Sequence, residues 1–211
     1  MKSAWGPWLL IAGAALALVG GYLVWHGMPG KPLPAGDLPR VIEVRNGEAL
    51  PPFSLQGTQG EFGNDKLLGR WTFLFFGYTQ CPDICPSALS LMKELRVQLA
   101  TNGAVAPAPT FQVVFVSVDP RRDTRELLAQ YLAAFDPSFI GASGNDASLA
   151  PLAGKLGIQY RRHDETDQRN YTVDHSATIQ LIDPKGRLAM VFPHLQDASQ
   201  MAAAFRRIIA R

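Results

Sequence analysis

The chain of 211 residues has only two cysteines, Cys81 and Cys85, which stand four positions apart. A disulfide between them would close so short a loop that it would restrain little of the unfolded chain, which argues against a purely structural role. The formal net charge is only +2, and this balance gives no reason to expect nucleic-acid binding. The basic clusters are short, lie among acidic residues and are expected to be solvated: Arg121-Arg122, Arg161-Arg162 and Arg206-Arg207.

Charge is absent from residues 3–25. A helix of that length spans ~35 Å at 1.5 Å per residue, enough to cross a ~30 Å hydrocarbon core. Aromatic residues mark both ends of the run, as an interfacial belt would: Trp5, Trp8, Tyr22 and Trp25. The apolar region of a cleaved signal peptide is shorter, ~7–15 residues, so we expect an uncleaved anchor, although Ala-Gly-Ala-Ala near position 14 leaves cleavage open.

These features predict three parts: a membrane anchor over 1–27, a tether over 28–45 and a folded domain over 46–211. The tether begins with a Pro- and Gly-rich stretch, which is typical of an extended, semi-rigid spacer. The remaining residues, about 165, suit one compact domain with a core of its own. No Arg- and Ser-rich leader is present, which favours a bacterial membrane protein over a mitochondrial precursor.

Apolar patterns predict the order hairpin, β, α, β, α, β, α, β, β, α within the domain. The expected ranges are a hairpin over 47–63, strands over 71–76, 111–118, 139–140, 177–182 and 188–192, and helices over 86–100, 124–135, 146–156 and 197–211. This order predicts an α/β fold, a thioredoxin-like mixed sheet flanked by helices on both faces. Asp123 and Glu126 have the spacing of a capping box, and residues 160–170 are expected to form an exposed excursion.

The two cysteines lie where a buried strand passes into the first helix, and sites in α/β folds collect at the carboxyl ends of strands. The helix N-terminus is expected to lower the pKa of a thiol there. Cysteines at i and i+4 across a helix start can bring both sulfurs to one face. Cys81 and Cys85 could therefore close a small, reducible disulfide, or hold a soft metal ion as two thiolates.

An imidazole would complete a common soft-metal set, so the four histidines are candidates for a third ligand. We favour His175, because it lies just before the strand over 177–182, in a loop that sits beside the first βα turn of a thioredoxin-like fold. His26 flanks the predicted anchor, His163 is expected to face water, and His194 lies in a Pro-containing loop. Asp174 either orients the His175 ring or forms a turn.

Three blocks of the sequence resemble the SCO/SenC family and occur in that family's order. They are residues 77–86 (Gly-Tyr-Thr-Gln-Cys-Pro-Asp-Ile-Cys-Pro), residues 118–124 (Val-Asp-Pro-Arg-Arg-Asp-Thr), and residues 171–176 (Tyr-Thr-Val-Asp-His-Ser) followed by 181–186 (Leu-Ile-Asp-Pro-Lys-Gly). The resemblance spans about residues 45 to 210. It implies a thioredoxin-like copper protein, anchored by one N-terminal helix, that helps to assemble cytochrome c oxidase, chiefly its copper A site.

The resemblance also implies that copper, as Cu(I) or Cu(II), is bound by Cys81, Cys85 and His175. Two thiolates and one imidazole suit soft Cu(I). Zinc would want a fourth ligand, which Asp83 or Asp174 could supply. The implied partners are the oxidase subunit that carries the copper A site and a copper donor protein. A periplasmic thiol reductant is also expected, because cysteines must be reduced to bind copper and would drift to the disulfide in an oxidising compartment. The family faces the periplasm or the intermembrane space, and the preference for a bacterial protein then gives the expected location: the bacterial inner membrane, with a single pass and the domain in the periplasm.

The favoured function is a metallochaperone that delivers copper to the oxidase and is not an enzyme. The alternative is a membrane-anchored thiol–disulfide oxidoreductase that reduces the oxidase's copper-site cysteines, with Cys81 and Cys85 as its catalytic redox pair. A peroxiredoxin-like peroxidase is a third hypothesis. The CxxxC spacing differs from the CxxC of thioredoxin-type reductases, and His175-Ser176 stands where those enzymes carry a proline, so the residues favour metal binding.

Overall fold

The computed structural model describes residues 22, 41–101, 111–163, 170–193 and 197–210. The chain divides into two units, residues 1–39 and residues 40–211. The predicted anchor, apart from Tyr22, and the first part of the predicted tether lie outside the described residues. Among the described helices, none has both the length and the apolarity that crossing a bilayer requires. The anchor and the three domain boundaries therefore stay predictions.

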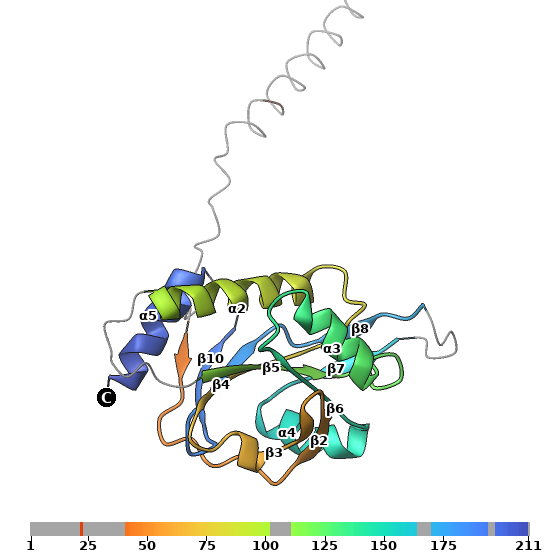
Figure 1. The fold of residues 1–211 in the computed structure, drawn as a ribbon, viewed down its shortest axis with the longest axis horizontal. Helices are drawn as coiled ribbons and strands as arrows, with labels where there is room; N and C mark the ends of the chain where they lie inside the picture. Colours follow the sequence, from red (N-terminus) through yellow and green to blue (C-terminus); the bar gives the residue numbers. More distant parts are fainter. Residues whose placement is uncertain (1–21, 23–40, 102–110, 164–169, 194–196, 211) are drawn as a thin grey trace, which may run out of the picture. The chain divides into compact units, whose positions relative to one another are not determined.

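The domain is built on one eight-stranded mixed sheet (Figure 1). Its central strands β4, β5 and β6 are parallel, and the outer strands pair antiparallel. Both faces of the centre are covered, which explains why β4 and β5 read as continuous apolar runs. In spatial order the strands are β1 (Ile42–Glu43), β10 (Leu188–Phe192), β9 (Ile179–Ile182), β4 (Trp71–Gly77), β5 (Phe111–Ser117), β6 (Ile140–Ser143), β2 (Ser54–Gly57) and β3 (Gly60–Gly63).

Helices cover both faces of the sheet, as predicted. In Figure 1, α2 (Ile84–Thr101) and α5 (Ala198–Ile209) lie side by side along one face, and they contact each other. The helix α3 (Arg125–Ala133) packs against β6, and α4 (Asp146–Lys155) lies on the other face. A short 3-10 helix, η1 (Asn64–Lys66), follows β3. The thioredoxin-like mixed sheet with flanking helices is thereby confirmed.

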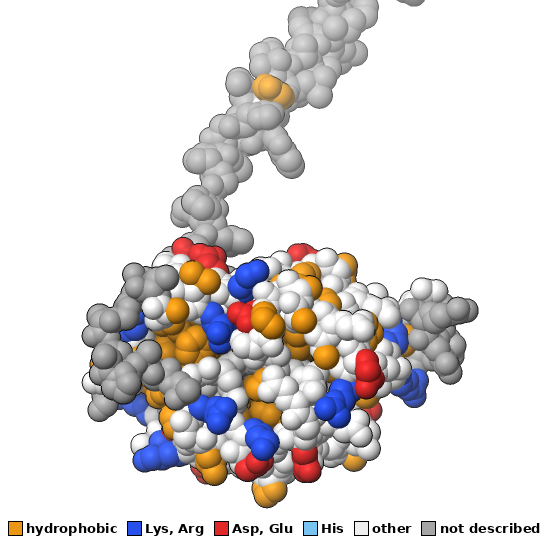
Figure 2. All heavy atoms as spheres, in the orientation of Figure 1, with side chains coloured by type: hydrophobic (Ala, Val, Ile, Leu, Met, Phe, Trp, Pro, Cys, Tyr) orange, Lys and Arg blue, Asp and Glu red, His pale blue; other side chains and the backbone are white. Residues whose placement is uncertain are grey.

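Phenylalanine fills much of the core between the sheet and its helices. Fully burying such a side chain stabilises a fold by about 1.5–3 kcal/mol. The largest buried side chains include Phe73, Phe75, Phe76, Phe115, Phe192 and Phe205. On the face drawn in Figure 2, acidic and basic side chains are interspersed among apolar ones, in keeping with the small net charge.

The predicted capping box at the start of α3 is wrong. Thr124 is the N-cap, and its side chain accepts a hydrogen bond from the Leu127 amide. Asp123 is buried instead, where its carboxyl accepts hydrogen bonds from Thr79 N, Thr79 Oγ1 and Ser117 Oγ. A buried polar group must be hydrogen-bonded, and these three donors meet that need for Asp123. Its carboxyl is therefore engaged in the interior and does not cap α3.

The prediction of an exposed excursion over 160–170 is also wrong at its start. Two strands, β7 (Tyr160–Arg162) and β8 (Val173–His175), pair antiparallel and form a separate two-stranded sheet. Residues 164–169, between them, lie outside the described residues. Both strands have only three residues, so neither carries a periodic pattern that sequence could reveal. This β7–β8 hairpin presents His175.

Candidate metal centre

The two cysteines follow the central strand β4. The chain turns after Gly77, Cys81 lies in the turn, and Cys85 is the second residue of α2. Both are buried free thiols, with 9% of Cys81 and none of Cys85 exposed. The Cys85 sulfur packs against bare backbone, since a Cβ on Gly77 would lie 2.6 Å from Sγ.

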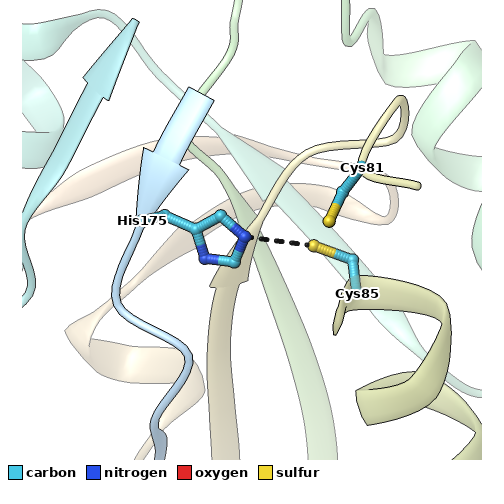
Figure 3. A group of neighbouring side chains, drawn as sticks. All are labelled: Cys81, Cys85 and His175. Carbon is cyan, nitrogen blue, oxygen red and sulfur yellow. Dashed lines mark hydrogen bonds between the residues drawn. The ribbon is translucent and has the colours of Figure 1, made fainter. Parts of the chain in front are cut away.

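His175 approaches the cysteines from the β7–β8 hairpin, and its ring points toward both sulfurs (Figure 3). Its Nε2 lies 3.4 Å from Cys85 Sγ. Its Nδ1 lies 3.2 Å from the Ser176 carbonyl oxygen, which can only accept, so Nδ1 carries the proton. The Nε2 lone pair therefore faces the sulfurs, as metal coordination requires. The nitrogen and the two sulfurs all lie within 4.8 Å of one another.

The surroundings of the cluster keep Cys85 and His175 uncharged. Phe75 and Tyr78 each hold a ring 5.9 Å from the His175 ring in a T-shaped arrangement. Burial lowers the pKa of His175 below its ordinary value of 6.5, so the ring is neutral near pH 7. Burial also raises the pKa of the Cys85 thiol well above its usual range. The expectation that the helix N-terminus would lower thiol pKa is wrong for Cys85, because desolvation outweighs the helix dipole there.

Neither of the two aspartates considered as a fourth ligand joins the cluster. Asp174 Oδ2 lies 2.6 Å from Nε2 of the partly exposed His163, so its carboxylate does not orient the His175 ring. Asp83 is exposed at the start of α2. Within the described part of the chain, the candidate metal-binding group contains three residues. His26 and His194 lie outside the described residues.

Sequence reasoning missed one residue beside the cluster, Arg122. Its cluster Arg121-Arg122 was expected to be solvated, yet only 7% of the Arg122 side chain is exposed. Arg162 is similarly buried, with 8% of its side chain exposed. Arg122 belongs to the block over 118–124 that carries the family resemblance. Its place in that block could have indicated that Arg122 has a role beyond a solvated surface charge.

Comparison with known families matches residues 44–210 to SCO1/SenC. The chain belongs to the SCO1/SenC family. An SCO2-like protein of Rickettsia prowazekii is 38% identical over 138 residues, covering 64% of this chain and 65% of that protein. The human mitochondrial SCO1 homolog is 32% identical over 154 residues, covering 72% of this chain and 50% of its own. These matches span less than two thirds of either relative's length.

Solved structures of the family show the same fold. Arabidopsis thaliana ScoI with copper bound superimposes with a TM-score of 0.69 at 30% identity, over 77% of this chain and 99% of that one. Yeast Sco1 with copper bound gives a TM-score of 0.68 at 28% identity, over 77% and 90%. The resemblance predicted from the three sequence blocks is confirmed at the level of family and fold.

Proposed function

We propose that this SCO1/SenC protein binds copper through Cys81 Sγ, Cys85 Sγ and His175 Nε2. The observation that carries the proposal is the convergence of these three atoms within 4.8 Å, from a helix start and a hairpin 90 residues apart. Two sulfur donors and one imidazole suit soft Cu(I). The copper-bound Arabidopsis and yeast relatives support the same choice of metal.

The donor set also suits a cargo that must be passed on. Three donors leave a coordination position that an incoming thiolate can occupy while a bond to a site sulfur breaks, so copper moves by ligand exchange and keeps its oxidation state. A surface pocket of about 570 Å³ borders His175, and neither cysteine lines it. Its lining residues are Gln159, Tyr160, Arg161, Asp174, His175 and Ser176.

We infer from the family resemblance that the recipient is the copper A site of cytochrome c oxidase. A copper donor protein would load the site, and a periplasmic thiol reductant would keep both cysteines reduced, because metal binding requires thiolates. Residues 1–27 would anchor the protein in a bacterial inner membrane, with 28–45 as tether and 46–211 in the periplasm. Copper loading that is unchanged in cells lacking every such reductant would contradict the reductant's role.

The alternative function is reduction of the oxidase's copper-site cysteines by Cys81 and Cys85. It is favoured by one observation: the two free thiols lie side by side, their sulfurs within 4.8 Å. Disulfide exchange needs no imidazole, whereas the proposed copper site does. Replacing His175 with alanine separates the two functions.

The test measures copper stoichiometry and oxidase assembly for the His175→Ala variant. Copper delivery predicts that both fall together. If copper binding is lost and assembly is retained, the reductase function is supported and copper delivery is refuted.

A further inference from the structure

The hairpin that carries His175 is not part of the main sheet. Strands β7 and β8 pair with each other, and neither joins the eight-stranded ladder. The main sheet restrains only the C-terminal side of the hairpin, since β9, which pairs with β4, begins four residues after His175. The segment before β8 has no such pairing with the main sheet, so side-chain contacts with the domain must hold that side of the hairpin.

Arg122 makes such contacts with both segments of the cluster. Its Nη1 donates to the Tyr171 carbonyl oxygen at 2.8 Å, two residues before β8. The same nitrogen donates to Gln80 Oε1 at 3.0 Å, and Gln80 directly precedes Cys81. Its Nε donates to Asp119 Oδ2 at 2.5 Å. One guanidinium thus joins the segment of the hairpin just before β8 to the cysteine loop.

Aromatic stacking fixes the plane of this guanidinium. Arg122 Cζ lies 3.6 Å from the centre of the Tyr171 ring and 5.7 Å from that of Tyr78. The Tyr171 hydroxyl donates to the same Asp119 carboxylate that Arg122 contacts. The Tyr78 ring in turn packs against His175. A planar fork with several N–H donors can make all these contacts at once, and a lysine ammonium cannot.

The other arm of the hairpin is held differently. Arg162, in β7, donates to the Val118 carbonyl oxygen from Nε at 2.9 Å and from Nη2 at 2.6 Å, and it pairs with Asp146. These contacts attach the hairpin to the ends of β5 and α4. Arg122, by contrast, contacts the residue next to Cys81. We therefore single out Arg122.

We propose that Arg122 is a positioning residue that holds the His175 hairpin against the cysteine loop, and thereby sets the affinity of the Cys81–Cys85–His175 cluster for copper. This inference rests on the proposed function, because it assigns Arg122 a part in the same site. Residues that orient metal ligands typically contribute 10–100-fold to metal affinity.

The test is Arg122→Lys, which keeps the charge and removes the planar fork. Cu(I) affinity of the reduced, full-length protein is measured by competition with a chromophoric Cu(I) chelator, with and without His175→Ala. We expect a loss of roughly tenfold or more with His175 present and no further loss in the His175→Ala background. An equal loss in both backgrounds, or no loss with His175 present, overturns the proposal.

A second measurement needs no copper. Hydrogen exchange of the metal-free protein should speed up over residues 171–175 in Arg122→Lys. The matched control is Arg187→Lys, which disrupts the Arg187–Asp183 ion pair at the opposite end of the sheet. That control should leave both the exchange of 171–175 and copper affinity unchanged. Exchange over 171–175 that is identical in wild type and Arg122→Lys overturns the proposal.

Gln80→Ala serves if Arg122→Lys does not fold, since Gln80 is exposed and only its bond to Arg122 is removed. A charge-assisted hydrogen bond of this kind predicts a loss of roughly fivefold in Cu(I) affinity, and unchanged affinity overturns the proposal. A wild-type protein that binds no Cu(I) refutes the proposed function. Hydrogen exchange alone then decides whether Arg122 holds the hairpin.

Discussion

Gly77→Ala tests how closely the cluster is packed. A Cβ at this position would lie 2.6 Å from Cys85 Sγ and 2.9 and 3.0 Å from two carbons of the Phe115 ring. Ordinary contact begins at 3.4 Å, so the sulfur must move by nearly an ångström and the ring must also shift. The backbone of Gly77 is not in the left-handed region, so alanine brings no conformational strain and the steric clash is the whole effect.

Overpacking of this kind costs about 1–3 kcal/mol in the free energy of unfolding. For a domain of this size, each kcal/mol lowers Tm by about 2–4 °C, so Gly77→Ala should lower Tm by roughly 2–12 °C. Displacement of one donor should also lower Cu(I) affinity by about tenfold or more. The assays are thermal unfolding of the metal-free protein and Cu(I) competition.

The matched control is Gly154→Ala in α4. No atom lies within 4 Å of a Cβ built there, and the position is exposed. Alanine in a helix is favoured over glycine by about 0.5–1 kcal/mol, so Tm should hold or rise. Gly77→Ala with unchanged Tm and unchanged copper affinity would refute the packing described for Cys85.

Three further predictions concern protons and thiols. Burial keeps the Cys85 thiol protonated and His175 neutral, so Cu(I) binding should release the Cys85 thiol proton. The apparent affinity should therefore rise about tenfold per pH unit for that proton. Cu(I) competition at pH 6.5, 7.25 and 8 checks this, and equal affinities would contradict it. In the reduced, metal-free protein, iodoacetamide should modify Cys81 faster than the fully buried Cys85, as peptide mass spectrometry would show; equal rates would count against the burial described here. Burial and the Asp119 carboxylate raise the pKa of Tyr171 from 10 to about 12, so its hydroxyl stabilises the fold below pH 10 and that stabilisation is lost as pH rises toward 12. In urea titrations, the free energy of unfolding of Tyr171→Phe should therefore fall less between pH 10 and 12 than that of the wild type. An identical fall in both proteins would disprove the raised pKa of Tyr171.

The parts of the fold that could be predicted are those with a recognisable pattern in their own residues or in the residues next to them. The strands β4 and β5 are recognisable because burial on both faces leaves continuous apolar runs. Gly157 directly follows the predicted helix over 146–156, and it has the positive φ of +67° that is typical of a glycine just past a helix end. The convergence of His175 with the cysteines is also predictable, since fold topology places its loop beside the first βα turn.

What could not be predicted depends on contacts between distant segments. The β7–β8 hairpin is stabilised by its own pairing and by two buried arginines, and composition makes Arg122 and Arg162 look solvated. Asp123 has the spacing of a cap, but its carboxyl is taken up by Thr79, 44 residues away. The raised pKa of Cys85 follows from complete burial, which its place at a helix start does not reveal.

The most direct test of the central claim is X-ray absorption at the copper edge of the reduced, full-length protein loaded with one equivalent of Cu(I). The proposed site predicts a shell of two sulfurs and one imidazole nitrogen, with the nitrogen missing in His175→Ala. A copper shell without nitrogen in the wild type, or a spectrum unchanged by His175→Ala, would contradict it.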